Sequence, residues 1–285
     1  MPRSSGYTTA LRNIGSIRNS GFELQLDGRI IDRAVKWDLG VNFSLNRSKV
    51  LVLSEDKDIF GGELDNTILK DQLNLMRVGE PMYVFYGYVE DGYDENGHIV
   101  YKNMDDDPAI TAADKTIIGD PNPDFLVNLT TAVSYKGFTL SAFFQSSIGN
   151  DIYSLSMAAQ AYDYGYNGNT LREVYYNHWT LENPTAKYPN LDQTSYKMSD
   201  RFVYDGSFVR LKNLELAYDV PCARNKFIKR ARVYVSAQNL FTITSYPFWD
   251  PDINANGGGS SMIQGVDSYC YPSARTYTIG CRLTF

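Results

Sequence analysis

Oxygen-bearing side chains recur through residues 103–114, NMDDDPAITAAD, at the spacing used by EF-hand-like calcium loops. Ca²⁺ takes six to eight oxygen ligands, and one short loop of this spacing can wrap several of them around one point. The segment therefore predicts a calcium site, and Ca²⁺ is the only cofactor that the sequence suggests. Its expected ligands are the side chains of Asn103, Asp105, Asp107, Thr111 and Asp114, with the backbone carbonyl of Ala109.

Two residues depart from the calcium-loop pattern. Pro108 stands where such loops have the glycine that makes the sharp turn, and Asn103 stands where they have an aspartate. The alternative is an acidic, solvated loop in which Asp and Asn side chains form turns with the backbone. The sequence leaves both interpretations open.

Aromatic residues are the second group with possible binding chemistry, since the chain has 22 Tyr and 14 Phe but only 2 His. Tyr and Trp suit surfaces that are apolar on one side and wet on the other. In the segments expected to be loops, these rings predict a stacking surface for sugar rings or peptide side chains. The alternative is that they pack the loops together. The candidate ligand contacts are Tyr83, Tyr86, Tyr88, Tyr162, Tyr164, Tyr166 and Trp179.

Sequence patterns for catalysis are absent. There is no GxSxG, HExxH or phosphate-binding loop, and neither His98 nor His178 has a Cys or His partner at metal-ligand spacing. A net charge of −6 argues against a nucleic-acid partner, which requires a basic surface. The three cysteines contain no CxxC pair, which excludes a zinc module. We therefore expect a binding or transport protein that is not an enzyme.

Apolar and polar residues alternate along seven segments, which is the period-2 pattern of β-strands with two different faces. In 36–46, five apolar residues alternate strictly with polar residues or glycine. The pattern is poorest in 207–218, where Arg210 and Lys212 share a parity with Leu214. About ten residues is the length with which a tilted strand crosses a bilayer. The predicted strands are 22–30, 36–46, 125–135, 138–148, 207–218, 231–241 and 276–285.

Short and long connections alternate between these strands. The short ones are 31–35, 136–137 and 219–230, whereas 47–123, 149–206 and 242–274 are long. Transmembrane barrels have short periplasmic turns and long extracellular loops, so this asymmetry predicts an all-β, antiparallel transmembrane β-barrel. The sequence contains no run of 18 apolar residues, so it predicts no transmembrane helix. Its first residues lack the apolar core of a signal peptide.

Aromatic residues at the strand ends fit two membrane girdles, one at each interface. A periplasmic girdle is expected from Trp37, Tyr135, Phe138, Tyr218 and Phe285. An extracellular girdle is expected from Phe22, Phe125, Phe144, Phe208 and Phe241.

Several blocks together resemble the C-terminal barrel of the SusC/RagA family of TonB-linked outer-membrane transporters, from about Asn13 to Phe285. They include NIGSIRNSGFELQL, IIGDPNPDFLVNLTTAVSYKGFTLSAFFQSSIGNDIY, NHWTLENPTAKYP, DGSFVRLKNLELAYDVP, RVYVSAQNLFTITSY and YPSARTYTIGCRLTF. The resemblance implies the last seven strands of a 22-stranded barrel, with long extracellular loops. It implies that residues 1–285 are a C-terminal segment, and that the signal peptide, N-terminal extension, TonB box and plug domain lie upstream.

The resemblance also implies a function. Such transporters import glycans or peptides across the outer membrane of Gram-negative Bacteroidetes, with energy from TonB and a SusD-like lipoprotein over the extracellular loops. Two alternatives come from other classes. One is a passive porin, which requires an independently complete barrel. The other is a soluble or surface glycan-binding β protein, in which the apolar parity would be buried within the protein.

Overall fold

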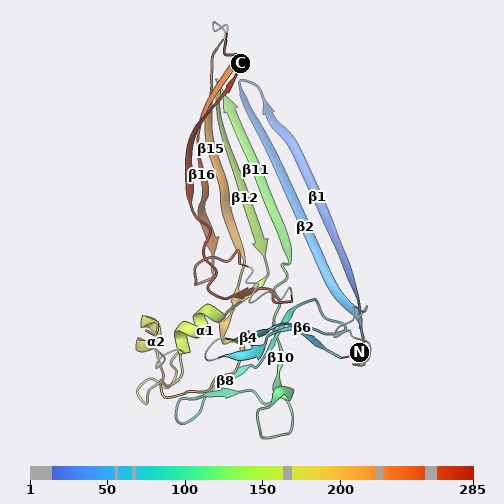
Figure 1. The fold of residues 1–285 in the computed structure, drawn as a ribbon, viewed down its shortest axis with the longest axis vertical. Helices are drawn as coiled ribbons and strands as arrows, with labels where there is room; N and C mark the ends of the chain where they lie inside the picture. The colour runs from blue at the N-terminus through green and yellow to red at the C-terminus, as the bar shows by residue number, and fades with distance from the viewer. Residues whose placement is uncertain (1–14, 55–56, 66–68, 163–168, 223–226, 254–261) are drawn as a thin grey trace, which may run out of the picture.

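The dominant element of the fold is a seven-stranded antiparallel sheet whose strands follow one another in sequence order (Figure 1). The computed structural model describes residues 15–54, 57–65, 69–162, 169–222, 227–253 and 262–285. All seven predicted strands are confirmed, and 125–135 and 138–148 have the predicted bounds. The strands are β1 (Gly15–Asp32), β2 (Val35–Leu53), β11 (Phe125–Tyr135), β12 (Phe138–Ile148), β15 (Phe208–Val220), β16 (Arg230–Thr244) and β18 (Thr276–Thr284). In the part of the chain that the structure describes, no helix is long and apolar enough to cross a membrane.

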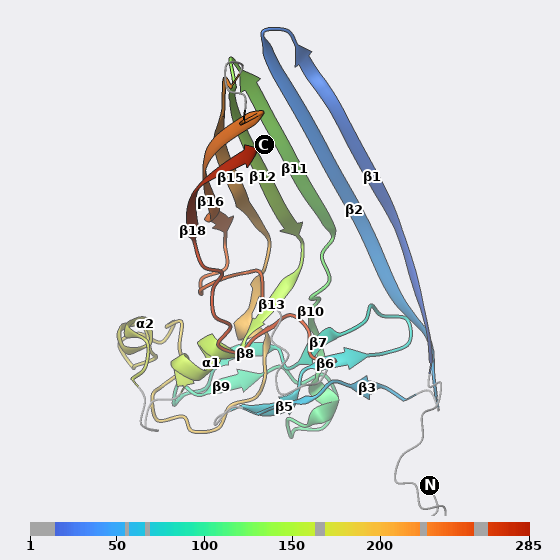
Figure 2. The same ribbon diagram turned by 45° about the horizontal axis from the view of Figure 1, so that its top comes forward.

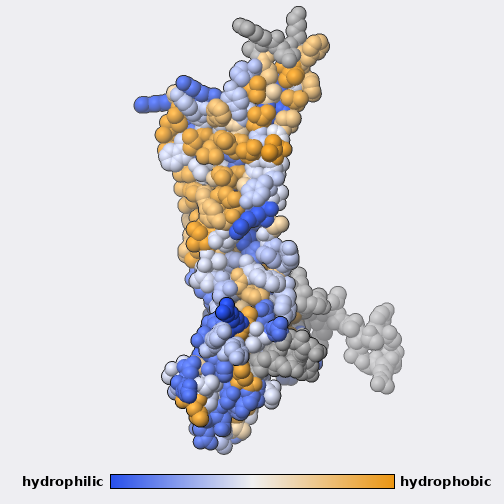
Figure 3. Space-filling model, turned by 90° about the vertical axis from the view of Figure 1, so that its left-hand side faces the viewer, coloured by the Kyte–Doolittle hydropathy of each residue, from blue (hydrophilic) through white to orange (hydrophobic). Residues whose placement is uncertain are grey.

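Strand register places most of the apolar residues of this sheet on one of its faces. Paired residues of antiparallel strands project to the same side, and Val235 of β16 pairs with Leu216 of β15 and Ile279 of β18. All three are exposed, at 47%, 45% and 87%. Polar residues such as Ser236 lie on the other face, where it pairs with Glu215. Figure 3 shows hydrophobic residues gathered over the sheet, in the upper part of the view, and mostly hydrophilic residues over the lower end of the molecule.

A bulge in β15 explains the poor alternation of that segment. The register with β12 shifts between the pairs Phe143–Asn213 and Phe144–Leu211, so Lys212 is an extra residue. The extra residue reverses the parity, which puts Leu211 on the apolar face and Arg210 on the polar face. In the sequence, Arg210 and Lys212 share the parity of Leu214, which suggests that only the second half of this strand is apolar on one side. The extra residue shows that the suggestion is wrong, because it assumes an unbroken alternation.

Tight turns close the sheet at one end. Between β11 and β12, Lys136 and Gly137 both have positive φ, 48° and 86°, which is the backbone of a two-residue type I′ hairpin turn. β1 and β2 are joined at the same end by residues 33–34 (Figure 1). The described residues of the long connections lie at the opposite end, in the lower part of Figures 1 and 2.

The described residues of the long connections 54–124, 149–207 and 245–275 fold together into what we call the loop module. Small sheets join them, and β13 pairs with β14 and, in parallel, with β17. The elements are β3 (Ile59–Phe60), β4 (Glu63–Asp65), β5 (Lys70–Gln72), β6 (Asn74–Met76), β7 (Val84–Gly87), β8 (Glu90–Tyr93), β9 (Ile99–Tyr101), 3₁₀ helix Ala112–Asp114, β10 (Thr116–Gly119), β13 (Asp151–Ser154), α1 (Leu155–Tyr162), α2 (Arg172–Tyr176), 3₁₀ helix Asp200–Phe202, β14 (Val203–Asp205) and β17 (Val266–Asp267).

One buried cluster of apolar side chains draws on all three connections of the loop module. Phe85, Tyr153 and Val266 come from different connections, and none of them is accessible to solvent. A polar link supports this core, because Arg201 donates from Nε to Glu90 Oε2 at 2.7 Å and Ser199 Oγ donates to Glu90 Oε1 at 2.6 Å. The loops at this end are therefore an ordered body with its own core.

Substitution of Gly97, in the turn between β8 and β9, tests the packing of the loop module. Its φ is +79°, and a Cβ at this position would overlap the indole ring of Trp179, which is 8% exposed. We expect Gly97→Ala to lower the free energy of unfolding by about 1–3 kcal/mol. Gly92→Ala is the matched control, since Gly92 has φ +99° and open space around it. Denaturant titration followed by tryptophan fluorescence measures both. Equal losses in the two variants would mean that backbone strain, and not the packing of Trp179, sets the cost.

Candidate functional site

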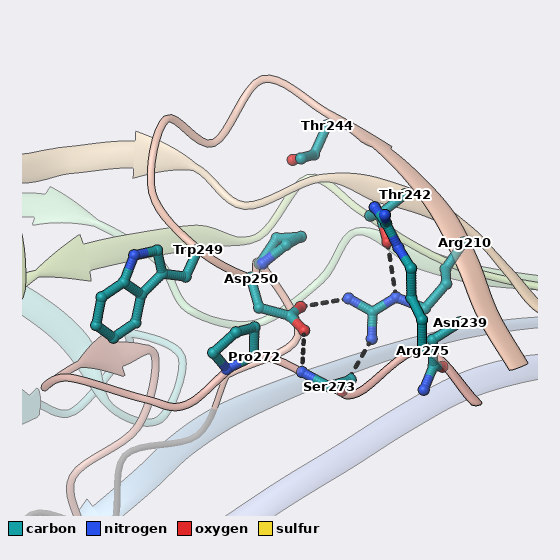
Figure 4. A pocket seen from close by; sticks show the side chains of 10 residues that line it. Arg210, Asn239, Thr242, Thr244, Trp249, Asp250, Pro272, Ser273 and Arg275 are labelled. Carbon is teal, nitrogen blue, oxygen red and sulfur yellow. Dashed lines mark hydrogen bonds and ion pairs between the residues drawn. The ribbon is translucent and has the colours of Figure 1, made fainter.

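A cavity of about 340 Å³ opens on the polar face of the sheet, where β15 and β16 meet the loop module (Figure 4). Strands supply one wall through Arg210, Asn239 and Thr242. The connection 245–275 supplies the other wall, and its residues include Trp249 and Asp250. The volume falls at the lower end of the range for small-molecule sites. The full lining is Arg210, Asn239, Thr242, Thr244, Trp249, Asp250, Pro251, Pro272, Ser273 and Arg275.

Arg210 holds the two walls of this cavity together. Its side chain is 2% exposed, and its guanidinium donates to Asp250 Oδ1, to Asp252 Oδ2 at 3.2 Å and to Thr242 Oγ1 at 2.9 Å. Asp250 Oδ2 in turn accepts the backbone N–H of Ser273 at 3.0 Å. The result is a buried ion pair with its hydrogen bonds satisfied, which fixes the loop connection against the strands.

The charge of Asp250 is maintained despite its burial. Burial alone would raise the pKa of its carboxyl group, but the backbone amides of Ser273 and Asp252 and the Arg210 guanidinium donate hydrogen bonds to the charged form. The pKa of Asp250 is therefore held below its usual value. Sequence reasoning missed this pair, although the anomalous parity of Arg210 within 207–218 was a signal for it.

The aromatic rings predicted as ligand contacts differ in their exposure where the structure describes them. Tyr88, Tyr162 and Trp179 are buried, at 5%, 4% and 8% exposure, and Tyr162 stacks on Tyr196 with a centroid distance of 3.8 Å. Tyr83 and Tyr86 are partly exposed. Tyr164 and Tyr166 lie outside the described residues. Burial fits the loop-packing interpretation for the first group, and ligand contact stays a prediction for the set.

The predicted calcium loop contains a chain of turns between side chains and backbone. Asn103 Oδ1 accepts from the amide of Asp105, Asp105 from that of Asp107, and Asp107 from that of Ala109. Both oxygens of the buried Asp114 accept backbone amides, from Met104 and Thr111 at 2.7 Å each, and these bonds hold the pKa of Asp114 below its usual value. The side chain of Thr111 instead caps the following 3₁₀ helix.

These contacts do not exhaust the oxygens of the loop, because a carboxylate oxygen has more than one acceptor site. Among the described residues, however, no group of three or more His, Cys, Asp or Glu side chains is arranged to hold a metal ion. The calcium site at Asn103, Asp105, Asp107, Ala109, Thr111 and Asp114 stays a prediction.

Calorimetric titration with Ca²⁺ tests that prediction. If the loop binds, we expect a dissociation constant in the range of about 10⁻⁴–10⁻³ M, typical of weak extracellular sites. The heat should disappear in Asp105→Asn and remain in Asp106→Asn, because Asp106 is not at a ligand position. No heat with millimolar Ca²⁺, or equal heats for both variants, would contradict a calcium site.

The residues predicted for the periplasmic girdle lie at the tight-turn end of the sheet. Tyr135, Phe138 and Tyr218 are paired in register across three strands, and the rings of Phe138 and Tyr218 are 4.5 Å apart. Trp37 donates from Nε1 to Thr131 Oγ1 at 2.9 Å. Phe285 is 71% exposed. Contact of these residues with lipid stays a prediction.

At the other end of the sheet, Phe22, Phe43 and Phe125 form an aromatic row on the apolar face, with centroid distances of 6.2 and 5.8 Å. Phe208 differs from the expectation for an outward-facing ring. It is 4% exposed and lies on the polar face, where it pairs with Ser147 and Thr244. The bulge at Lys212 reverses the parity of this part of β15, which is why the sequence placed Phe208 on the wrong face.

Comparison with known proteins gives a consistent set of relatives, although no protein-family model matches the sequence. TonB-dependent receptor P3 of Formosa agariphila is 31% identical over 100% of this chain and 30% of its own length. TonB-dependent receptor SusC of Bacteroides thetaiotaomicron is 28% identical over 96% of this chain and 27% of its own length.

Solved structures agree with the curated relatives. A structure of the RagAB peptide transporter matches with a TM-score of 0.79 and 26% identity, over 100% of this chain and 31% of the matched chain. The RagAB peptide importer in its "open-open" state matches with a TM-score of 0.78 and 27% identity. The chain spans about a third of the length of these relatives.

Proposed function

We infer that this chain forms part of the barrel wall of a nutrient importer in the outer membrane of a Gram-negative bacterium. Along its whole length it matches the C-terminal part of TonB-dependent receptors of the SusC and RagA type. The main support for this proposal is that the sheet has one apolar and one polar face. Val235, Leu216 and Ile279 present an exposed apolar surface, which is costly in water and favourable in lipid. The opposite, polar face then lines the lumen.

The edges of the sheet support a larger barrel. Among the described residues, no strand pairs with the outer side of β1 or of β18. In a bilayer every backbone N–H and C=O must be paired, so an open edge cannot face lipid. We therefore propose that residues 1–285 supply seven strands of a 22-stranded barrel, and that the remaining strands, the plug domain and the N-terminal extension belong to a region upstream.

The loop module suits the receiving side of such an importer. It is an ordered body at the end of the sheet away from the tight turns (Figure 1), and so it would lie outside the cell. We propose that it contacts a SusD-like lipoprotein and the incoming glycan or peptide, and that TonB acts through the upstream region. The work of the protein is then binding and gated passage, with no bond made or broken.

Uptake measurements in the bacterium that makes this protein test the proposal. We expect deletion of its gene to abolish uptake of at least one labelled member of a set of oligosaccharides and peptides. Depletion of TonB should abolish the same uptake. Uptake that needs the gene but is unaffected by TonB depletion would instead favour a passive porin. Recovery of the protein without detergent, from the soluble fraction, would favour the soluble or surface glycan-binding alternative.

A further inference from the structure

The cavity beside Arg210 contains a second arginine, Arg275. Arg275 lines the cavity and is exposed, and in the described part of the chain no carboxylate forms an ion pair with it. We propose that this cavity is a subsite for a carboxylate group of the imported ligand, with Arg275 as its contact. This inference rests on the import function proposed above, and it assigns a ligand chemistry to a site on the polar face.

Arg210 and Arg275 have different roles in this cavity. The charge of Arg210 is balanced by Asp250 and Asp252, and its side chain is almost entirely buried, so it forms a wall (Figure 4). Among the described residues, no carboxylate balances Arg275 in this way. A guanidinium recognises carboxylates well because its planar N–H groups can donate two parallel hydrogen bonds to the two oxygens. Arg210 thus supports the structure of the cavity, and Arg275 is the residue that contacts the ligand.

A residue of β16 holds the backbone next to Arg275 in place. Asn239 has φ +52° at the register shift of β16, and its Nδ2 donates to the backbone carbonyl of Ala274 at 2.9 Å. Ala274 directly precedes Arg275, so this bond fixes the backbone from which the guanidinium extends. A fixed backbone reduces the conformational entropy that a ligand must remove when it binds.

The other lining groups complete a mixed polar and apolar surface. Trp249 is 54% exposed, and Phe248 stacks on it with a centroid distance of 4.8 Å and an interplanar angle of 18°. An indole presents an apolar face to a ligand. Thr242 Oγ1 already accepts from Arg210, which leaves its hydroxyl hydrogen for an oxygen of the ligand. The site therefore suits a carboxylate attached to a residue with an apolar face.

Two kinds of oligomer carry such a group, an acidic sugar and the C-terminal residue of a peptide. Binding to the native polypeptide that carries this chain, purified in detergent, distinguishes them. The probes are a galacturonate disaccharide against the corresponding galactose disaccharide, and the dipeptide Ala-Ala against its C-terminal amide. We expect one acid to bind at roughly millimolar concentration and its neutral counterpart to bind about tenfold more weakly.

Variants connect that preference to the cavity. Arg275→Gln should remove the acid preference, Arg275→Lys should restore part of it, and Arg282→Gln should leave it unchanged. Arg282 is the control because it is an arginine on the polar face of β18, paired with Arg232, and does not line the cavity. Binding of neither acid, equal binding of both members of each pair, or an unchanged preference in Arg275→Gln would overturn the subsite. An acid preference without TonB-dependent uptake would overturn the import function and leave the subsite standing.

Discussion

Replacing Arg210 with methionine should lower the free energy of unfolding by about 3–5 kcal/mol, because Asp250 would remain buried without its cation. The loss should appear in urea titration of the detergent-solubilised protein, and proteases should cut within 245–275 more readily. The affected region is the connection that Arg210 holds against β15 and β16. Methionine keeps most of the side-chain volume, so the change removes mainly the charge and its hydrogen bonds.

Two controls separate the buried charge from a general effect of substitution. Arg232→Gln breaks more exposed pairs with Glu215 at 3.6 Å and Asp219 at 3.5 Å, and should cost about 0–1 kcal/mol. Adding Asp250→Asn to Arg210→Met removes the uncompensated charge and should recover part of the stability. A loss below about 1 kcal/mol for Arg210→Met would contradict the role of this pair.

The same pair predicts a pH dependence. The pKa of Asp250 in the folded protein is below its unfolded value, which for an aspartate is about 3.9. Its contribution to stability is therefore fully present above the unfolded pKa and declines as pH falls through the lower folded pKa. Wild-type protein should lose more stability than Asp250→Asn as the pH falls into this range.

Replacing Val235 with arginine is the second change with a large expected effect. If the apolar face meets lipid, an arginine near the middle of the sheet should cost about 2–4 kcal/mol and reduce insertion into the outer membrane. Ser236→Arg is the matched variant, since Ser236 is the next residue and projects to the opposite, polar face. It should insert at close to the wild-type level.

This pair of variants also separates an apolar face that meets lipid from one that meets water. Val235 is already 47% exposed, so a protein that keeps this face in water would tolerate an arginine there. Heat-modifiable migration on gels, with quantification of the outer-membrane fraction, gives the readout. Normal insertion of Val235→Arg together with loss of Ser236→Arg would reverse our assignment of the two faces.

The sequence predicts the sheet well because the information is local. Strict alternation in 36–46 and a looser alternation in 125–135 indicate these strands, and Lys136-Gly137 indicates a tight turn. The alternation of short and long connections gives the two ends of the sheet. These signals require only neighbouring residues, since side chains of a strand point alternately to its two faces.

The site was harder to predict because it depends on contacts between distant parts of the chain. One extra residue, Lys212, reverses the parity of half a strand, and its position cannot be counted from alternation alone. The pairing of Arg210 with Asp250 spans 40 residues, and the core of the loop module joins three separate connections. Burial of Tyr88 and Tyr162 likewise results from this shared core, which aromatic content alone does not reveal.

Lipid accessibility along β16 tests the central claim, that this sheet is part of a membrane barrel, most directly. Single cysteines at residues 233–237, in a background without the three native cysteines, would carry a fluorophore in bilayers containing brominated lipids. We predict strong quenching at 233, 235 and 237 and weak quenching at 234 and 236. Equal quenching at all five positions, or none, would contradict a sheet with one face in lipid.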